Sequence, residues 1–146
     1  LVFWFDLLSE SVAACGVISC LLVGGCRGIY AALIPMVRRI ELEYPQLREP
    51  LRLVQITDVH IGSRNQAFLE RIVHRVAELK PDILCITGDL IDQRGVPQSV
   101  LSCFSELTMP IYFVIGNHER YEDLEDILTS LGLVGLQKLR NTSCGF

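Results

Sequence analysis

Four side chains that suit a divalent cation follow three short apolar runs of the sequence. An aspartate and a histidine two positions apart follow the first run, Gly-Asp closes the second, and Gly-Asn-His-Glu closes the third; the four candidates are Asp58, His60, Asp89 and Asn117. Carboxylate oxygen, imidazole nitrogen and amide oxygen all bind hard or borderline divalent ions. Two carboxylates in one crevice without a cation repel each other, and one of them tends to hold a proton. This set of residue types therefore predicts a metal site.

The middle aspartate is suited to bridge two ions. A pair of ions about 3.5–4 Å apart needs a shared ligand, and a carboxylate at the end of the middle strand is well placed to supply it. That position belongs to Asp89. We therefore expect Asp58 and His60 to serve one ion and Asn117 to serve the other.

The runs that carry these ligands have the composition of buried β-strands. They lie within residues 53–57, 82–87 and 111–115 and are rich in β-branched residues. Apolar residues recur at helical spacing in three further stretches: 66–80, 100–107 and 121–132. The order βαβαβ predicts an α/β fold of parallel strands with right-handed crossovers, and residues 134–139 look like the start of another strand. Ligands bind beyond the carboxyl ends of such strands, where all four candidates fall.

The first 39 residues differ in character from the rest. Residues 12–26 carry no charge, and after Arg27 the apolar character resumes as far as Val37. A membrane-spanning helix needs about 20 residues, and this stretch suffices if Arg27 lies at an interface. A buried helix is the alternative, but a helix apolar on all sides has no comparable partner here. A secretory signal peptide is disfavoured because Asp6 and Glu10, rather than basic residues, precede the apolar run.

Charged residues after the apolar stretch indicate its orientation. Arg38 and Arg39 follow it, and basic residues beside a span favour the cytoplasmic side. We therefore predict a cell-membrane protein with an anchor at 1–39, a polar, proline-containing connector at 40–50 and a cytoplasmic domain at 51–146. The sequence does not start with Met and shows no evident finish, so we expect it to be part of a longer protein.

Composition argues against several other functions. The net charge is −4 and no basic patch is present, so nucleic acid is not an expected partner. Three of the six cysteines lie in the N-terminal apolar stretch and Cys85 lies within a predicted strand, where cysteine behaves as a small hydrophobic residue. We expect no disulfide framework and no cysteine-based zinc site. The sequence does not indicate an oligomeric state.

The three ligand groups together resemble the first three signature motifs of the calcineurin-like metallophosphoesterases. Asp58-x-His60, Gly88-Asp89 and Gly116-Asn117-His118-Glu119 occur in the family's order, about thirty residues apart. The resemblance covers residues 51–139. With the apolar lead it is closest to the membrane-associated bacterial branch, which includes pyrophosphatases of the UDP-diacylglucosamine type. It implies the first half of an α+β sandwich domain that hydrolyses a phosphomonoester, phosphodiester or pyrophosphate; the anchor adds the hypothesis of a lipid-linked substrate.

The resemblance also assigns the metal ligands. It implies two divalent ions, of Mn, Fe, Zn or Mg, with a hydroxide held between them that attacks phosphorus in line. By this resemblance Asp58 and His60 bind the first ion, Asp89 bridges, and Asn117 binds the second.

Two further residues receive a catalytic role from the resemblance. His118 would stabilise or protonate the leaving oxygen rather than bind metal, and Asp92 matches the position whose carboxylate orients that histidine in some members. A carboxylate fixes the tautomer of a histidine and raises its basicity. A plain loop carboxylate is the alternative for Asp92. Glu119 is expected to support the site rather than bind metal, and His74, four residues after Glu70 on a helix, is expected to be solvated.

The chain departs from the family where further ligands are expected. The family's later motifs supply three more histidines, but none follows His118 here. We therefore expect a truncated site, so that this chain alone binds metal weakly and turns over slowly or not at all. A catalytically inactive, membrane-tethered interaction module is the alternative function. Phosphotransferases with a nucleophilic aspartate are disfavoured because they usually carry D-x-D, whereas position 60 is histidine.

Overall fold

The computed structural model describes residues 2–140 and 142. The chain divides into two compact units, Leu1–Leu42 and Glu43–Phe146. The predicted boundaries at 39/40 and 50/51 stay a prediction.

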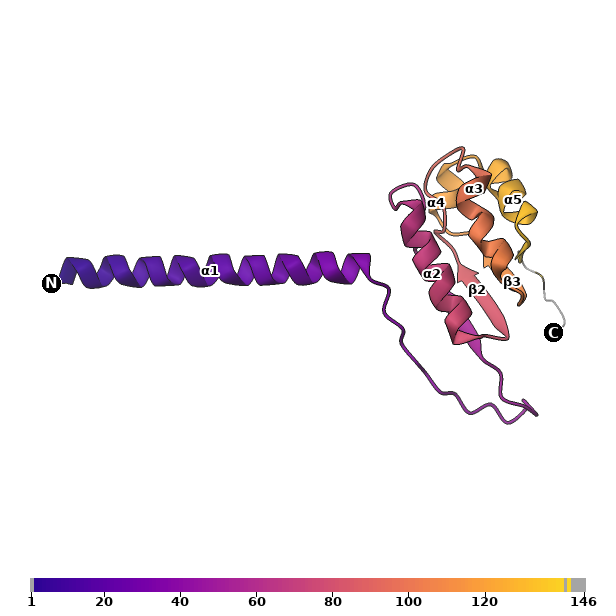
Figure 1. The fold of residues 1–146 in the computed structure, drawn as a ribbon, viewed down its shortest axis with the longest axis horizontal. Helices are drawn as coiled ribbons and strands as arrows, with labels where there is room; N and C mark the ends of the chain where they lie inside the picture. The colour runs from indigo at the N-terminus through magenta and orange to yellow at the C-terminus, as the bar shows by residue number, and fades with distance from the viewer. Residues whose placement is uncertain (1, 141, 143–146) are drawn as a thin grey trace. The chain divides into compact units, whose positions relative to one another are not determined.

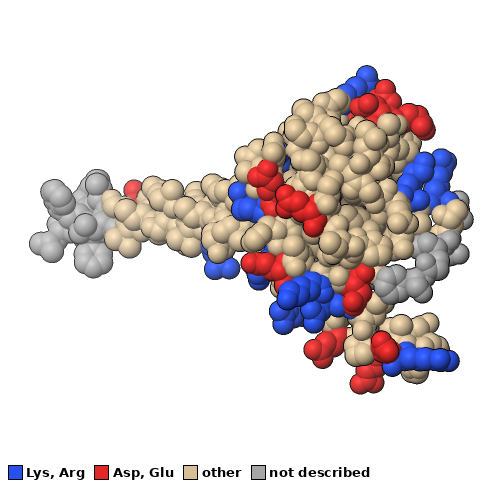
Figure 2. Space-filling view, turned by 45° about the vertical axis from the view of Figure 1, so that its right-hand side comes forward, with Lys and Arg blue, Asp and Glu red and all other residues tan. Residues whose placement is uncertain are grey.

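The first unit consists mainly of one helix, α1 (Val2–Leu33; Figure 1). Its segment Ser9–Ala31 is 23 residues long with a mean hydropathy of 1.9, and none of its most apolar window is buried within the protein. At 1.5 Å per residue it is about 35 Å long, which exceeds the roughly 30 Å of a bilayer's hydrocarbon core. The helix stops two residues before Pro35, which lacks the N–H needed to continue it. Figure 2 shows few charged side chains along it.

The second unit is built on a four-stranded parallel sheet. Its strands are β1 (Leu53–Ile56), β2 (Ile83–Thr87), β3 (Ile111–Val114) and β4 (Leu136–Lys138), and they lie side by side in chain order. In register, Ile56 lies beside Ile86, and Ile86 beside Phe113. This arrangement confirms the predicted α/β fold, including the additional strand. Because all strands are parallel, their carboxyl ends meet at one edge.

Helices between the strands cover one face of the sheet. They are α2 (Gln66–Leu79), α3 (Gln98–Leu101), the 3₁₀ helix η1 (Ser102–Glu106) and α5 (Leu124–Leu133; Figure 1). A further short helix, α4 (His118–Tyr121), follows the loop after β3. Helix α2 buries Leu69, Ile72, Val73 and Val76, the apolar face that the sequence predicts. The Asn65 side chain caps it by accepting a hydrogen bond from the Phe68 amide at 3.0 Å.

Buried and exposed side chains alternate along the strands, because successive side chains point to opposite faces of the sheet. Leu84, Ile86, Ile111 and Phe113 belong to the buried core with α2, α3 and α5. The neighbouring side chains Gln55, Thr87 and Gln137 are exposed and point the other way. When parallel strands lie in chain order and every crossover is right-handed, all connecting helices lie on the same side of the sheet. This explains why one face of the sheet is buried and the other is exposed.

Two predicted helices differ in detail from the structure. The stretch 100–107 is a short α3 followed by 3₁₀ helix, and the Ser102 hydroxyl donates to the Ser99 carbonyl at 2.7 Å, a side-chain bond that competes with regular helix. The stretch 121–132 is interrupted after Tyr121, since Asp123 accepts a hydrogen bond from the Asp126 amide and so starts a new helix, α5.

Candidate metal centre

Three of the four predicted ligands converge at the carboxyl ends of β1 and β2. One ligand atom each from Asp58, His60 and Asp89 lies within 4.8 Å of the other two. Nε2 of His60 lies 3.8 Å from Oδ1 of Asp58. Two loops that the sequence separates by about thirty residues thus deliver oxygen and nitrogen to one point, as the strand order requires.

Hydrogen bonds between the two loops hold this geometry. The amide of Asp58 donates to the Gly88 carbonyl at 3.2 Å, and the amide of His60 donates to the Asp89 carbonyl at 3.0 Å. Asp58, His60 and Asp89 all have a positive φ, of 56°, 55° and 52°. Residues other than glycine rarely adopt a positive φ. Where they do, surrounding contacts impose it, often at functional sites. Sequence reasoning does not reveal this strain.

The third loop is tied directly to the predicted bridging carboxylate. Oδ1 of Asp89 accepts a hydrogen bond from the His118 amide at 2.9 Å. Gly116 makes the approach possible, because a Cβ there would overlap the carboxylate of Asp89. Gly88 has a φ of 94°, and a Cβ on it would lie 2.7 Å from the Gly116 Cα. Both glycines are therefore needed for close contact between the two loops.

Asn117 lies beside the cluster by virtue of this loop, but its own role stays a prediction. It is exposed and precedes α4 without capping it through its side chain. Within the described part of the chain the side-chain amide of Asn117 has no hydrogen-bond partner. Its position between Gly116 and His118 leaves this amide available to a ligand.

A second cluster contains the two predicted catalytic residues. Ligand atoms of His60, Asp92 and His118 lie within 4.8 Å of one another, and the rings of His60 and His118 meet edge to face with centroids 4.5 Å apart. Oδ2 of Asp92 is 3.5 Å from Nδ1 of His60. The carboxylate thus lies near both histidines, and its ion-pair contact is with His60.

Ser63 fixes the Asp92 carboxylate, a contact that sequence reasoning missed. Its amide donates to Oδ1 at 3.0 Å and its hydroxyl donates to Oδ2 at 2.5 Å. Partial burial raises the pKa of Asp92, but the two bonds from Ser63 and the charges of His60 and His118 lower it more, so the pKa lies below its ordinary value. The only signal in the sequence was that a hydroxyl residue follows the first motif.

Glu119 is fully buried, with no exposed surface, and belongs to neither cluster. Its carboxylate accepts hydrogen bonds from backbone amides of the second and third loops, including that of Gly116 at 2.9 Å. His74 is exposed, as predicted, but its described contact is with Glu78 at 3.5 Å rather than with Glu70.

The donor set fits a divalent cation. Two carboxylates, those of Asp58 and Asp89, share a narrow space with His60. A cation removes their repulsion, and the mixed oxygen and nitrogen ligands match Mn, Fe, Zn or Mg. The residues that would hold it are Asp58, His60 and Asp89.

Comparison with known proteins agrees with this geometry. Residues 51–144 match the family model described as calcineurin-like phosphoesterase. The chain therefore belongs to the calcineurin-like metallophosphoesterase family, which confirms the resemblance seen in its motifs.

Its relatives include bacterial and vertebrate proteins. An uncharacterized metallophosphoesterase of Campylobacter jejuni is 32% identical over 114 residues, which are 70% of this chain and 30% of that protein. A transmembrane protein with metallophosphoesterase domain from Danio rerio is 34% identical over 122 residues, 78% of this chain and 28% of that protein. The UDP-2,3-diacylglucosamine pyrophosphatase LpxG of Chlamydia trachomatis is 35% identical over 74 residues, 47% of this chain and 22% of that protein. The chain thus spans about 30% of the length of the first two relatives.

Proposed function

We propose that the protein containing this chain is a membrane-anchored, metal-dependent phosphoesterase. The observation that supports it most is the convergence of Asp58, His60 and Asp89 within 4.8 Å. Bound divalent ions would supply an activated water and neutralise charge on the phosphoryl group. Asp58 and His60 would hold one ion, Asp89 both, and Asn117 the second.

The remaining residues would position the substrate and the departing group. The Asn117 amide has no other described partner and would donate to a phosphoryl oxygen or bind the second ion through its oxygen. His118 would donate a proton to the leaving oxygen, and Asp92 would hold the histidine pair in the required tautomers. Ser63 would keep Asp92 in place through its two hydrogen bonds.

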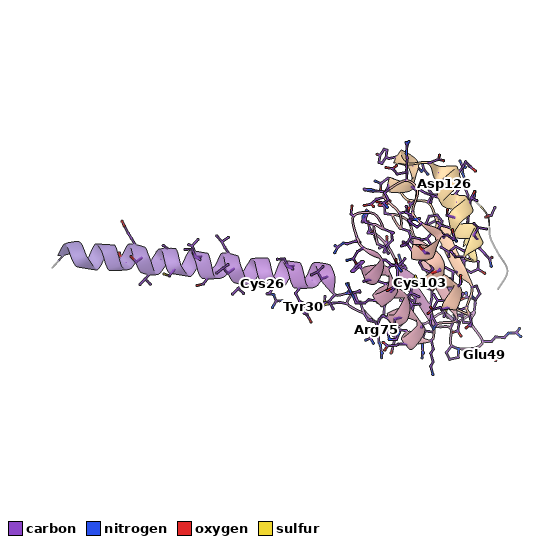
Figure 3. The ribbon with its side chains drawn as sticks, turned by 45° about the horizontal axis from the view of Figure 1, so that its top comes forward. Cys26, Tyr30, Glu49, Arg75, Cys103 and Asp126 are labelled. Atoms are coloured by element: carbon purple, nitrogen blue, oxygen red, sulfur yellow. The ribbon has the colours of Figure 1, made fainter. Side chains whose placement is uncertain are left out.

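A direct assay tests this function. The full-length protein, loaded with Mn²⁺, is expected to hydrolyse bis-p-nitrophenyl phosphate, and Asp89→Asn is expected to lose at least about a hundredfold in kcat and half of the bound metal. Asp126→Asn is the matched control, because it makes the same change on the exposed surface of α5 (Figure 3). Equal activity and metal content in both variants would disprove the assignment. If the full-length protein binds metal but hydrolyses no phosphoester, the alternative of an inactive interaction module is favoured.

We also propose that the substrate is lipid-linked and that α1 is a permanent anchor. A helical segment of 23 residues with a mean hydropathy of 1.9 supports the anchor. The pyrophosphatase relative, whose name specifies a diacylated sugar nucleotide, supports the substrate. Membrane fractions washed with carbonate should retain the protein with residues 1–31 intact, and proteolysis of spheroplasts from outside should leave the domain uncut. An N-terminus that begins beyond Ala31 would indicate a cleaved signal sequence. Turnover of soluble esters alone would exclude a lipid-linked substrate.

A further inference from the structure

A hollow lined by two arginines opens beside the loop that carries Asn117 and His118. Its volume is about 400 Å³, and its wall consists of Arg120, Arg140 and four apolar residues, Val114, Ile115, Leu124 and Leu139. This volume lies in the usual range of small-molecule sites, which are mostly apolar with a few polar groups.

Neither arginine of the hollow is neutralised by the described part of the chain. Arg75 and Arg94 form ion pairs with Glu78 and Glu122, at 2.6 and 3.1 Å. No such partner is present among the described residues for Arg120 or Arg140, and the lining contains no carboxylate. Two arginines in the wall of one hollow give it positive charge, which favours an anionic ligand. Guanidinium is also the side chain best suited to bidentate hydrogen bonding of phosphate oxygens.

The hollow lies close to the candidate metal centre along the chain. Ile115 precedes Asn117 by two residues, and Arg120 follows His118 by two. Arg120 and His118 belong to the same turn of α4, so one wall of the hollow and one member of the second cluster share this short helix. A ligand held at the metal centre therefore lies next to the helix that supplies one of the two arginines.

We propose that Arg120 and Arg140 form an anion subsite for a second phosphate group of the substrate, separate from the reacting phosphorus. The apolar wall contacts the carbon skeleton that joins the two groups. The substrate class is accordingly a phosphoester with two anionic groups a few carbon atoms apart. This inference rests on the proposed phosphoesterase function.

A pair of matched inhibitors tests the subsite. Butane-1,4-bisphosphonate and butylphosphonate differ only in the second anionic group, and both are titrated against bis-p-nitrophenyl phosphate hydrolysis by the Mn²⁺-loaded full-length protein. The wild type should bind the bisphosphonate about tenfold more tightly than the monophosphonate, the usual scale of a charge-assisted contact. Arg120→Gln and Arg140→Gln should each reduce this ratio to about two or below. Calorimetric titration of the same ligands gives the ratio without relying on turnover.

Arg75→Gln is the control, because Arg75 pairs with Glu78 on the exposed surface of α2 (Figure 3). It should keep the wild-type ratio. Hydrolysis with no preference for the bisphosphonate, or a preference that survives both arginine substitutions, would overturn the subsite while leaving the phosphoesterase function in place. Failure of the wild-type protein to hydrolyse the ester at all would instead count against the proposed function, and calorimetry would still decide the subsite.

Discussion

The carboxylate of Glu119 accepts a hydrogen bond from the backbone amide of Leu90 at 2.6 Å. The same carboxylate also accepts bonds from the amides of Ile91 at 3.1 Å, Asp89 at 3.1 Å and Gly116 at 2.9 Å. One buried side chain thus fastens the loop of the predicted bridging ligand to the loop of Asn117 and His118. Because these amides would otherwise be buried without partners, the carboxylate determines where both loops lie.

Replacing this carboxylate should weaken both folding and metal binding. In Glu119→Gln, the new NH₂ group faces two amide donors, so about half of the bonds are lost. We expect a loss of roughly 3 kcal/mol in the free energy of unfolding and a lower metal content, measured by thermal unfolding and elemental analysis of the full-length protein. Glu125→Gln makes the same change on the exposed face of α5 and should stay within about 0.5 kcal/mol of wild type. A metal content unchanged in Glu119→Gln would refute the positioning role.

Two glycines with opposite surroundings give a second prediction. A Cβ on Gly116 would overlap the Asp89 carboxylate, whereas Gly132, within α5, has nothing within 4 Å of its added Cβ. Gly116→Ala should therefore abolish metal binding and destabilise the domain by about 2 kcal/mol. Gly132→Ala should stabilise it by about 0.5–1 kcal/mol through helix propensity. Chemical denaturation of the two variants checks both signs, and similar effects at the two positions would contradict the close contact.

The sequence predicts the parallel sheet, the candidate metal ligands at its edge and the protein family, because all three depend on local patterns. Strand composition and motif order place Asp58 and Asp89 at one edge, and the structure brings them together with His60. The sequence does not predict how the loops are supported. Glutamate often binds metal ions, so its residue type does not show that Glu119 supports the loops instead. The path of the third loop turns the Glu119 side chain inward, where it accepts a hydrogen bond from the Leu90 amide.

The helix boundaries show the same limit on a smaller scale. Helical spacing predicts one helix over 121–132, but the Asp123 side chain accepts a hydrogen bond from the Asp126 amide and so caps the start of a separate helix. Caps depend on the geometry of single side chains, which a periodic pattern does not contain.

Removing the Ser63 hydroxyl should make the domain more sensitive to acid. The pKa of Asp92 lies below its ordinary value, because hydrogen bonds from Ser63 and the charges of His60 and His118 outweigh the effect of burial. A depressed pKa stabilises the folded state above the unfolded-state pKa of about 3.9, and this contribution is lost as the pH falls through the folded-state pKa. Ser63→Ala should therefore shift the acid-unfolding midpoint of the metal-free full-length protein to higher pH, followed by circular dichroism.

Ser105→Ala is the matched control for this titration, because Ser105 is exposed on η1. Its acid midpoint should equal that of the wild type. A midpoint that moves equally in both variants, or in neither, would show that the hydroxyl bond from Ser63 does not stabilise the ionised carboxylate.

The thiol of Cys103 should be unreactive at neutral pH although the cysteine is free. It packs against the core of the domain, its Sγ lies 3.6 Å from the Val100 carbonyl, and burial raises its pKa to about 11 (Figure 3). At pH 8 only about 0.1% is then thiolate, the form that reacts with iodoacetamide. Peptide mapping by mass spectrometry should show slow labelling that accelerates about tenfold per pH unit until about pH 11.

The same shift makes folding depend on pH in the alkaline range. The folded thiol keeps its proton up to about pH 11, whereas the unfolded one loses it near pH 9. The folded state therefore binds more protons between these values, and its stability falls as the pH rises through this window. Cys103→Ala removes the titrating group, so its alkaline loss of stability should be smaller than that of the wild type. Protein unfolded in guanidinium provides the reference for labelling, and fast reaction of the folded protein at pH 8 would contradict the burial of this side chain.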